Sequence, residues 1–400
     1  MFSSRIPSDL APNRLARAVE ECRAEGRTII DLTASNPTLA GFAYPDDLLA
    51  PLGDRRGLIY SPHPLGALTA RRAVAADYER RGITIAPERI ALTSSTSEAY
   101  SLLFKVLCDP GDEVLTPRPS YPLFEHLTGL DAVVPRAYEV EYHGVWSINI
   151  ASIERALTER TRAILLVNPN NPTGSFVKRE ELDAVADVCG RRGIALIVDE
   201  VFADYELHAG AGGVRGQVLA RNDLLTFGLG GLSKSIGLPQ AKLGWIAVAG
   251  PEAVARAALA RLEFACDTYL SVSTPVQSAA PALMERGAAI RRQIQERVST
   301  NYRGIVEAVA LAPSCRILPA EGGWYAVMQV PFLEPEEDLV LELLAKHDVL
   351  VHPGYFFDFP RESFLIVSLL PPASAVTAGV IRILRHFGAA AAHQSRSEEL

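Results

Sequence analysis

The sequence predicts an α/β fold, with a large domain that holds a mostly parallel, helix-covered sheet and a smaller α+β domain built from the two chain ends. From about residue 88, short apolar runs alternate with segments whose apolar residues recur at helical spacing. This strand–helix–strand rhythm is typical of parallel sheets covered on both faces. A chain of 400 residues exceeds what one compact core usually holds. We therefore expect two domains, residues 46–280 and residues 1–45 with 281–400.

Six strands are expected in the large domain. In chain order they are RIALTSS (89–95), EVLTPRP (113–119), RAILLVNP (162–169), IALIVDE (194–200), LLTFGL (224–229) and LGWIAV (243–248). SEAYSLLFKVL (97–107) and KREELDAVADVCGRRG (178–193) have the apolar spacing of helices between them. Ligands of such sheets bind in the loops beyond the carboxyl ends of the strands.

The smaller domain is expected to mix strands and helices. Its strands are GGWYAVMQVP (322–331), VLVHPG (349–354) and FLIVSLL (364–370). We expect the N-terminal segment, residues 1–45, to join this unit.

Composition limits the class of protein. A net charge of −8 and a pI of about 5.6 argue against nucleic acid as a partner, because phosphate backbones need a basic face. The five cysteines are scattered and form no CxxC pair, which favours reduced thiols over a disulfide frame or a metal site. The N-terminus has no apolar signal region, and runs such as AILLV (163–167) are too short to span a membrane. We expect a soluble cytoplasmic protein.

The stretch GGLSKSIGLPQAKLGW (230–245) places Lys234 among glycines and serines. One interpretation is a P-loop nucleotide site, because GLGGLSKS (228–235) differs from G-x-x-x-x-G-K-[ST] at one position, Ser233. Two features weigh against it. A serine replaces the glycine that lets backbone amides wrap phosphate, and Gly237 and Pro239 interrupt the helix that should follow. The other interpretation is a lysine that forms a Schiff base with a phosphorylated cofactor.

Taken together, the motifs resemble those of the fold-type I, pyridoxal 5′-phosphate-dependent aminotransferases of class I/II. The motifs are GLSK (231–234), NPNNPTG (168–174), DEVFADY (199–205), TSSTSEA (93–99) and PRPSYPLF (117–124). The resemblance covers nearly the whole chain. It implies the fold of those enzymes, the cofactor and a lysine-bound Schiff base.

The resemblance also assigns roles around the cofactor ring. Lys234 is implied as the Schiff-base lysine and Asp199 as the partner of the pyridinium nitrogen. Asn171 would bond the 3-oxygen of the cofactor, next to a possible cis peptide before Pro172, and Tyr121 would stack on the ring. Three of these residues also have a purely structural interpretation. Asp199 could be a strand-end acid, Asn171 part of a tight turn and Tyr121 a core aromatic.

A phosphate site is implied at the turn before the helix at 97–107. Ser95 and Glu98 have the spacing of a capping box, and such a strand-to-helix turn is also an anion site. The implied phosphate-binding residues are Ser95, Thr96, Ser97, Ser233 and Lys242. Tyr60 stands where the family sends a tyrosine to the phosphate of the neighbouring subunit. That position implies a homodimer with shared active sites, although Tyr60 could also be an ordinary turn residue.

Several positions depart from the family pattern. Lys242 stands in place of an arginine, so phosphate binding is expected to be looser. Phe202 replaces a tyrosine that bonds the 3-oxygen of the cofactor, and Ile366 replaces the arginine that binds the substrate carboxylate. Arg361 is a candidate for the missing cation.

Two residues near the N-terminus are weak candidates for substrate contacts. Ser35 and Asn36 lie in TASNPT (33–38), where the family often has a glycine beside the substrate.

The expected reaction is transamination between an amino donor and a 2-oxo acid. Lys234 would act as general base once the donor displaces it from the cofactor. A lyase or related α-carbon reaction at the same site is the alternative, because reaction type depends on which bond of the α-carbon lies perpendicular to the ring.

Overall fold

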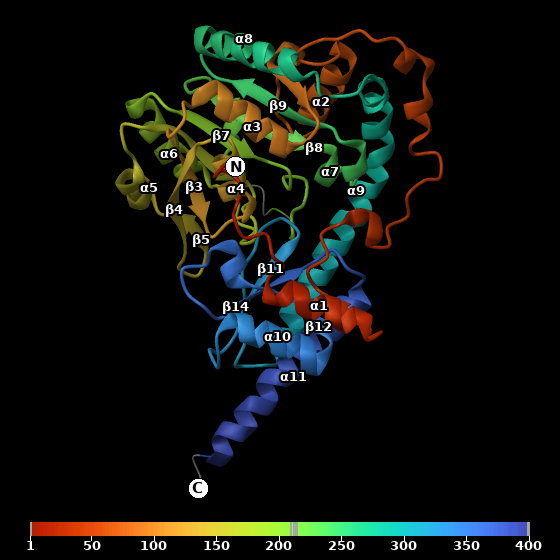
Figure 1. Ribbon diagram of the computed structural model, residues 1–400, viewed down its shortest axis with the longest axis vertical. Coiled ribbons are helices and arrows are strands. Elements are labelled where there is room, and N and C mark those ends of the chain that lie inside the picture. Colours follow the sequence, from red (N-terminus) through yellow and green to blue (C-terminus); the bar gives the residue numbers. More distant parts are fainter. Residues whose placement is uncertain (1, 209, 211–214, 398–400) are drawn as a thin grey trace.

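A computed structural model describes residues 2–208, 210 and 215–397, with side chains as far as residue 388. Figure 1 shows a larger upper part with one wide sheet and a lower part with smaller sheets, where the C-terminal helix projects. The helix α9 (Thr274–Val309) runs from the upper part into the lower part.

The large sheet has eight strands in the order β2-β9-β8-β7-β6-β3-β4-β5. The strands are β2 (Ile90–Thr93), β3 (Glu113–Arg118), β4 (Val134–Tyr142), β5 (Trp146–Ile148), β6 (Thr161–Val167), β7 (Ala195–Asp199), β8 (Thr226–Gly231) and β9 (Gly244–Ala249). The five strands β8, β7, β6, β3 and β4 are parallel, whereas β9 runs antiparallel to both β8 and β2, and β5 runs antiparallel to β4. The predicted mostly parallel sheet and its six predicted strands are thus confirmed.

The apolar runs form strands because both faces of the sheet are buried. Along β7, Leu196 and Val198 face one core cluster, while Ile197 faces the other, as the two-residue period of a strand requires. The first cluster includes Val185 of α6 (Arg179–Arg192), and the second includes Leu262 of α8 (Glu252–Tyr269). The sequence did not predict β4 or β5, because β4 is a partly exposed strand with charged residues between its apolar ones.

Helices cover the sheet and build the lower part. In chain order they are α1 (Arg14–Ala24), α2 (Leu68–Arg80), α3 (Thr96–Leu107), α4 (Leu123–Leu130), α5 (Ile150–Ala156), α6 (Arg179–Arg192), α7 (Leu232–Ser235), α8 (Glu252–Tyr269), α9, α10 (Glu336–His347) and α11 (Ala373–Ser397). The two helices predicted at 97–107 and 178–193 correspond to α3 and α6.

The lower part joins the two chain ends. Its four-stranded sheet has the order β10-β11-β14-β13, from β10 (Arg316–Leu318), β11 (Tyr325–Gln329), β13 (His352–Pro353) and β14 (Phe364–Ser368). A separate pair joins β1 (Ile30–Asp31) in parallel with β12 (Val349–Leu350). The N-terminal segment therefore packs with the C-terminal part. The division at 45/46 and 280/281 stays a prediction, and α9 runs through residue 280 without a break.

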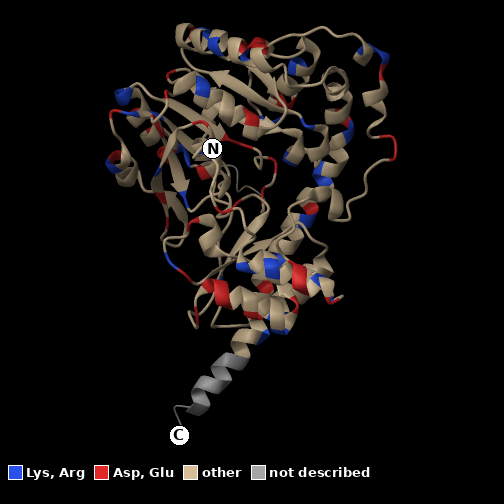
Figure 2. Ribbon diagram, in the orientation of Figure 1, with Lys and Arg blue, Asp and Glu red and all other residues tan. Residues whose placement is uncertain are grey.

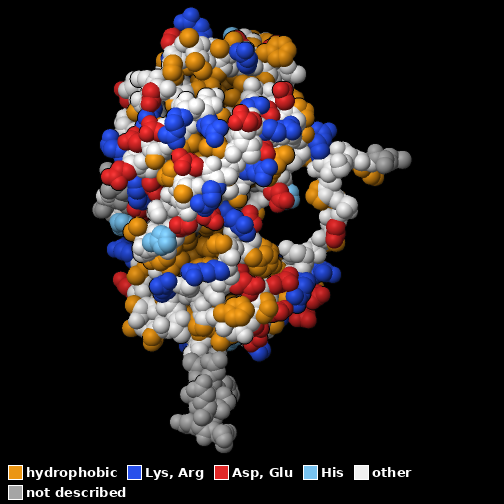
Figure 3. Space-filling model, turned by 90° about the vertical axis from the view of Figure 1, so that its left-hand side faces the viewer, with side chains coloured by type: hydrophobic (Ala, Val, Ile, Leu, Met, Phe, Trp, Pro, Cys, Tyr) orange, Lys and Arg blue, Asp and Glu red, His pale blue; other side chains and the backbone are white. Residues whose placement is uncertain are grey.

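Charged side chains of both signs are interspersed over both parts of the molecule (Figure 2). The segment before α1 stands away from the body in the space-filling view (Figure 3). It reaches α4, where the Arg5 guanidinium donates a hydrogen bond of 3.2 Å to the carbonyl oxygen of Leu130. Among the described helices, none combines the length and the apolar character needed to cross a membrane.

Candidate active site

Eleven of the residues singled out from the sequence line one cavity of about 330 Å³. They are Ser35, Ser95, Thr96, Ser97, Tyr121, Asn171, Asp199, Phe202, Ser233, Lys234 and Lys242. Most follow the carboxyl ends of the strands β2, β3, β6, β7 and β8, where parallel sheets bind their ligands. The topology of the sheet therefore brings together residues that lie up to 207 positions apart, from Ser35 to Lys242.

Lys234 lies in the short helix α7, directly after β8. Burial lowers the pKa of Lys234 from 10.5 to about 8, although the nearby carboxylate of Asp199 acts in the opposite direction. Its Nζ lies 5.0 Å from the ring centre of Trp324 and 5.8 Å from that of Phe202. Because a lower pKa leaves more neutral amine at pH 7, this environment suits a nucleophile or a base.

Asp199 ends the buried strand β7 and is 9% exposed. Burial raises the pKa of Asp199, but two hydrogen bonds favour its ionised form. The Tyr100 hydroxyl donates one of 2.8 Å, and the backbone N–H of Val201 donates one of 3.0 Å. Sequence reasoning missed Tyr100, because its helical spacing only indicates a core position on α3.

The turn between β2 and α3 forms one end of the cavity. The Ser95 hydroxyl accepts a hydrogen bond of 3.1 Å from the backbone N–H of Glu98, as its cap position predicted. The Glu98 carboxylate accepts from the backbone N–H of Ser94. Gly244 of β9 packs against this turn so closely that an added Cβ would lie 3.0 Å from the backbone of Ser95. With Lys242 in the same lining, a helix N-terminus and a cation share this end, which suits an anion.

Asn171 and Tyr121 complete the predicted set within the cavity. Asn171 is buried, its bond to Pro172 is cis, and its Oδ1 has no hydrogen-bond partner among the described residues. Tyr121 is 44% exposed, and burial of its hydroxyl end raises its pKa. The lining also includes Leu123, Leu127 and Tyr325, which the sequence did not single out.

Three predicted residues do not line this cavity. Arg361 is exposed and lies over the ring of Phe364 at 5.6 Å, so the structure does not bring it to the site as a substitute cation. The Asn36 side-chain oxygen is occupied by the backbone N–H and hydroxyl of Thr38, at 3.0 and 2.7 Å. Tyr60 is 73% exposed and lines a different hollow.

Ile366 is fully buried in the middle of β14, opposite Val327 and His352. No residue of β14 carries a cation. Within the described lining of the cavity, the cations are Lys234 and Lys242.

Comparison with known proteins assigns the chain to a family. The profile of the family "Aminotransferase class I and II" matches residues 27–377. The chain belongs to the class I and II aminotransferases. It is 30% identical over 385 residues to an alanine aminotransferase of Mycobacterium tuberculosis, covering 90% of this chain and 86% of that protein.

A further relative of this aminotransferase supports the same assignment, and a solved structure shares its fold. A glutamate–pyruvate aminotransferase of Haemophilus influenzae is 26% identical over 373 residues, covering 90% of this chain and 91% of that protein. The structure of an alanine aminotransferase from Pyrococcus furiosus has a fold similarity (TM-score) of 0.88 at 24% identity, covering 97% of this chain and 100% of that one. The predicted fold class and transaminase activity are confirmed.

The P-loop interpretation of residues 228–235 is wrong for this aminotransferase. Those residues form the end of β8 and α7, and α7 ends after four residues at Ser235. A P-loop needs a longer helix whose N-terminus faces the phosphates.

Proposed function

We propose that the cavity binds pyridoxal 5′-phosphate and that Lys234 holds it covalently and then acts as the base of transamination. The observation that carries the proposal is the buried amine of Lys234, with its pKa of about 8, in one cavity with the buried carboxylate of Asp199. The cavity also has the size of a small-molecule site, and its lining combines many polar side chains with apolar ones such as Phe124 and Val167.

The chemistry of the donor set matches the parts of this cofactor. Its phosphate would lie against Ser95, Thr96, Ser97, Ser233 and Lys242, where the N-terminus of α3 and a cation favour an anion. Asp199 would face the ring nitrogen, and the side-chain amide N–H of Asn171, which lines the cavity, would donate a hydrogen bond to the 3-oxygen. Tyr121 would cover the ring from the open side.

When bound, this cofactor withdraws electrons from the α-carbon of an amino acid. The residues of the chain supply proton transfer, charge stabilisation and the exclusion of water. Lys234 moves a proton at its Nζ, and its lowered pKa keeps part of the amine unprotonated near neutral pH. The hydrogen bond from Tyr100 favours the ionised form of the Asp199 carboxylate against the effect of burial, and an ionised Asp199 can hold a positive charge on its partner. The rings of Phe202 and Trp324 exclude water from one side of the amine.

For substrates, we propose a small amino donor such as alanine and a 2-oxo acid. The names of the relatives support this choice, and so do the apolar side chains of Leu123 and Leu127 in the cavity lining. The five cysteines are free, which supports a cytoplasmic location.

Borohydride trapping with a lysine variant tests the central proposal. Borohydride treatment of the cofactor-loaded protein should add the mass of the reduced cofactor to the peptide that contains Lys234. Lys234→Ala should lose the label and nearly all alanine–2-oxo acid activity, whereas Lys105→Ala, on the exposed side of α3, should keep both. Labelling at another lysine, or full activity of Lys234→Ala, would refute the proposal.

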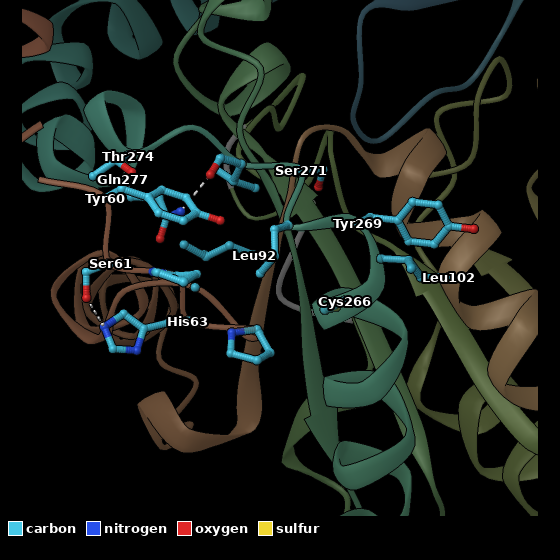
Figure 4. Close-up of a pocket in the computed structure, with 15 residues that line it drawn as sticks. Tyr60, Ser61, His63, Leu92, Leu102, Cys266, Tyr269, Ser271, Thr274 and Gln277 are labelled. Atoms are coloured by element: carbon cyan, nitrogen blue, oxygen red, sulfur yellow. Dashed lines mark hydrogen bonds between the residues drawn. The ribbon is translucent and has the colours of Figure 1, made fainter. Parts of the chain in front are cut away.

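We further propose that the chain forms a homodimer in which Tyr60 serves the partner's cavity. Exposed apolar side chains support a second copy as the occupant: Leu58, Ile59, Tyr60, Phe264 and Tyr269 are all largely exposed. Figure 4 shows Tyr60 and Tyr269 on opposite sides of one hollow beside Leu92, and Phe264 lines a second hollow together with Tyr269.

Mixed dimers test whether the sites are shared. Tyr60→Phe and Lys234→Ala should each be impaired alone, because each lesion affects both sites of its own dimer. Mixed dimers carry both lesions in one site and neither in the other, so part of the activity should return. No recovery in verified mixed dimers would rule out the shared site, and a monomer in light scattering would rule out the dimer.

A further inference from the structure

Four side chains of the kinds that bind zinc meet where α10 packs near α11, far from the cavity in sequence and absent from its lining. Glu334 precedes α10, Glu342 and His347 belong to α10, and His386 belongs to α11. Two segments of the chain, residues 334–347 and α11, therefore contribute to one cluster.

The distances in the cluster approach those of a tetrahedral site. Nδ1 of His386 lies 3.4 Å from Nε2 of His347 and 3.9 Å from a carboxylate oxygen of Glu342. Ligand atoms of Glu334, Glu342 and His386 all lie within 4.8 Å of one another. Zinc bonds of about 2.0–2.1 Å place tetrahedral ligand atoms about 3.4 Å apart. The two imidazoles already have this spacing, but His347 lies outside the group of three. Rotation of the His347 side chain and of the carboxylates therefore has to bring the four ligand atoms together.

Two further features indicate a prearranged site. The His386 side chain is only 10% exposed, with its ring nitrogen directed at the cluster. The two imidazole rings meet edge to face, with their ring centres 5.4 Å apart. The guanidinium of Arg382 on α11 donates a hydrogen bond of 2.7 Å to the carbonyl oxygen of His347. The ligand-bearing helices are thus held together before any ion binds.

We propose that Glu334, Glu342, His347 and His386 form a zinc site that fixes α11 to α10. Two imidazoles with two carboxylates suit zinc, whereas magnesium and calcium prefer ligand sets made of oxygen alone. The ammonium of Lys346 donates a hydrogen bond of 2.6 Å to Glu342 and partly balances the two carboxylates. Zinc displaces this ammonium from Glu342, so Lys346 competes with the ion.

Metal titration of the chelator-treated, cofactor-loaded protein tests the site. Isothermal titration should show one zinc per chain and no comparable binding of magnesium. His386→Gln should weaken zinc binding by roughly 10–100-fold or more, because it removes a ligand. Lys346→Met should strengthen binding, because it removes the competing cation, and this result is not expected of adventitious binding to surface histidines.

A matched control separates this cluster from other histidines. His143 is exposed and lies 3.0 Å from Glu141, so it forms a histidine–carboxylate pair elsewhere on the chain. His143→Gln should leave zinc binding unchanged. The proposal fails if His386→Gln binds zinc as tightly as the unaltered protein, if His143→Gln removes the binding, or if Lys346→Met weakens it. Circular dichroism checks folding, and Glu334→Gln replaces His386→Gln if that variant does not fold.

Discussion

Replacing Lys234 by methionine should stabilise the apoprotein at neutral pH. Burial lowers the pKa of Lys234 from 10.5 to about 8, so the unfolded chain binds more protons than the folded protein between these two values. Below pH 8 the folded state carries the whole cost of burying the ammonium, about 3 kcal/mol at about 1.4 kcal/mol per pKa unit. As pH rises toward 10.5, the unfolded chain also loses its proton and the cost disappears. By pH 9.5 about 1.4 kcal/mol of it remains.

Methionine has a similar length and no charge, so Lys234→Met removes this cost. Its advantage in free energy of unfolding should therefore shrink by about 2 kcal/mol between pH 7 and pH 9.5. Urea denaturation of both apoproteins at the two pH values measures this difference. The comparison uses apoprotein, since a covalently held cofactor would remove the free amine.

Lys105→Met provides the control, because Lys105 is exposed on α3. Its effect on the free energy of unfolding should be small and nearly equal at both pH values. An advantage of Lys234→Met that stays constant, or grows, from pH 7 to pH 9.5 would refute the claim that burial lowers the pKa of Lys234.

Three further variants test other contacts. Tyr100→Phe removes the 2.8 Å hydrogen bond to Asp199. Because hydrogen bonds to charged groups contribute about 1.5–3 kcal/mol, kcat/KM at pH 7 should fall roughly 10–100-fold. The control Tyr138→Phe loses a buried hydrogen bond to a carbonyl oxygen and should keep its kcat/KM. Lys242→Ala should raise the Kd for pyridoxal 5′-phosphate and leave the Kd for unphosphorylated pyridoxal unchanged. Fluorescence titration measures both constants, and equal effects on both would contradict a phosphate contact. Gly237→Ala should lower the Tm, because φ is +66° and the added Cβ would meet a tyrosine hydroxyl at 2.9 Å; an unchanged melting curve would show that the turn relaxes.

Much of the large domain could be predicted because its strands are buried on both faces. Continuous apolar runs such as residues 163–167 and 195–198 have few other places in a folded protein. The partly exposed strand β4 could not be predicted in this way, because charged residues alternate with its apolar ones. The short α7 was also not predicted, since four residues give no helical period.

Many residues that line the candidate cavity could be predicted, but the side chains that pack around them could not. Short motifs identified Lys234, Asp199, Asn171 and the turn at Ser95, because each lies just beyond a predicted strand. Nothing in the sequence indicated that Tyr100 points at Asp199, or that Arg361 packs on Phe364 away from the cavity. Those side chains come from helices and loops whose orientation depends on packing.

The sequence by itself determined the alternation of strands and helices, the family motifs and the loss of a cation from the last strand of the small sheet. All three depend on local residue order and on burial patterns that repeat every two or 3.6 residues. Only the tertiary structure decided what surrounds the buried amine, and hence its lowered pKa. It alone brought His347 and His386, 39 positions apart, within 3.4 Å. Proximity between distant segments, and the local dielectric that it creates, depends on how the elements pack and leaves no period in the sequence.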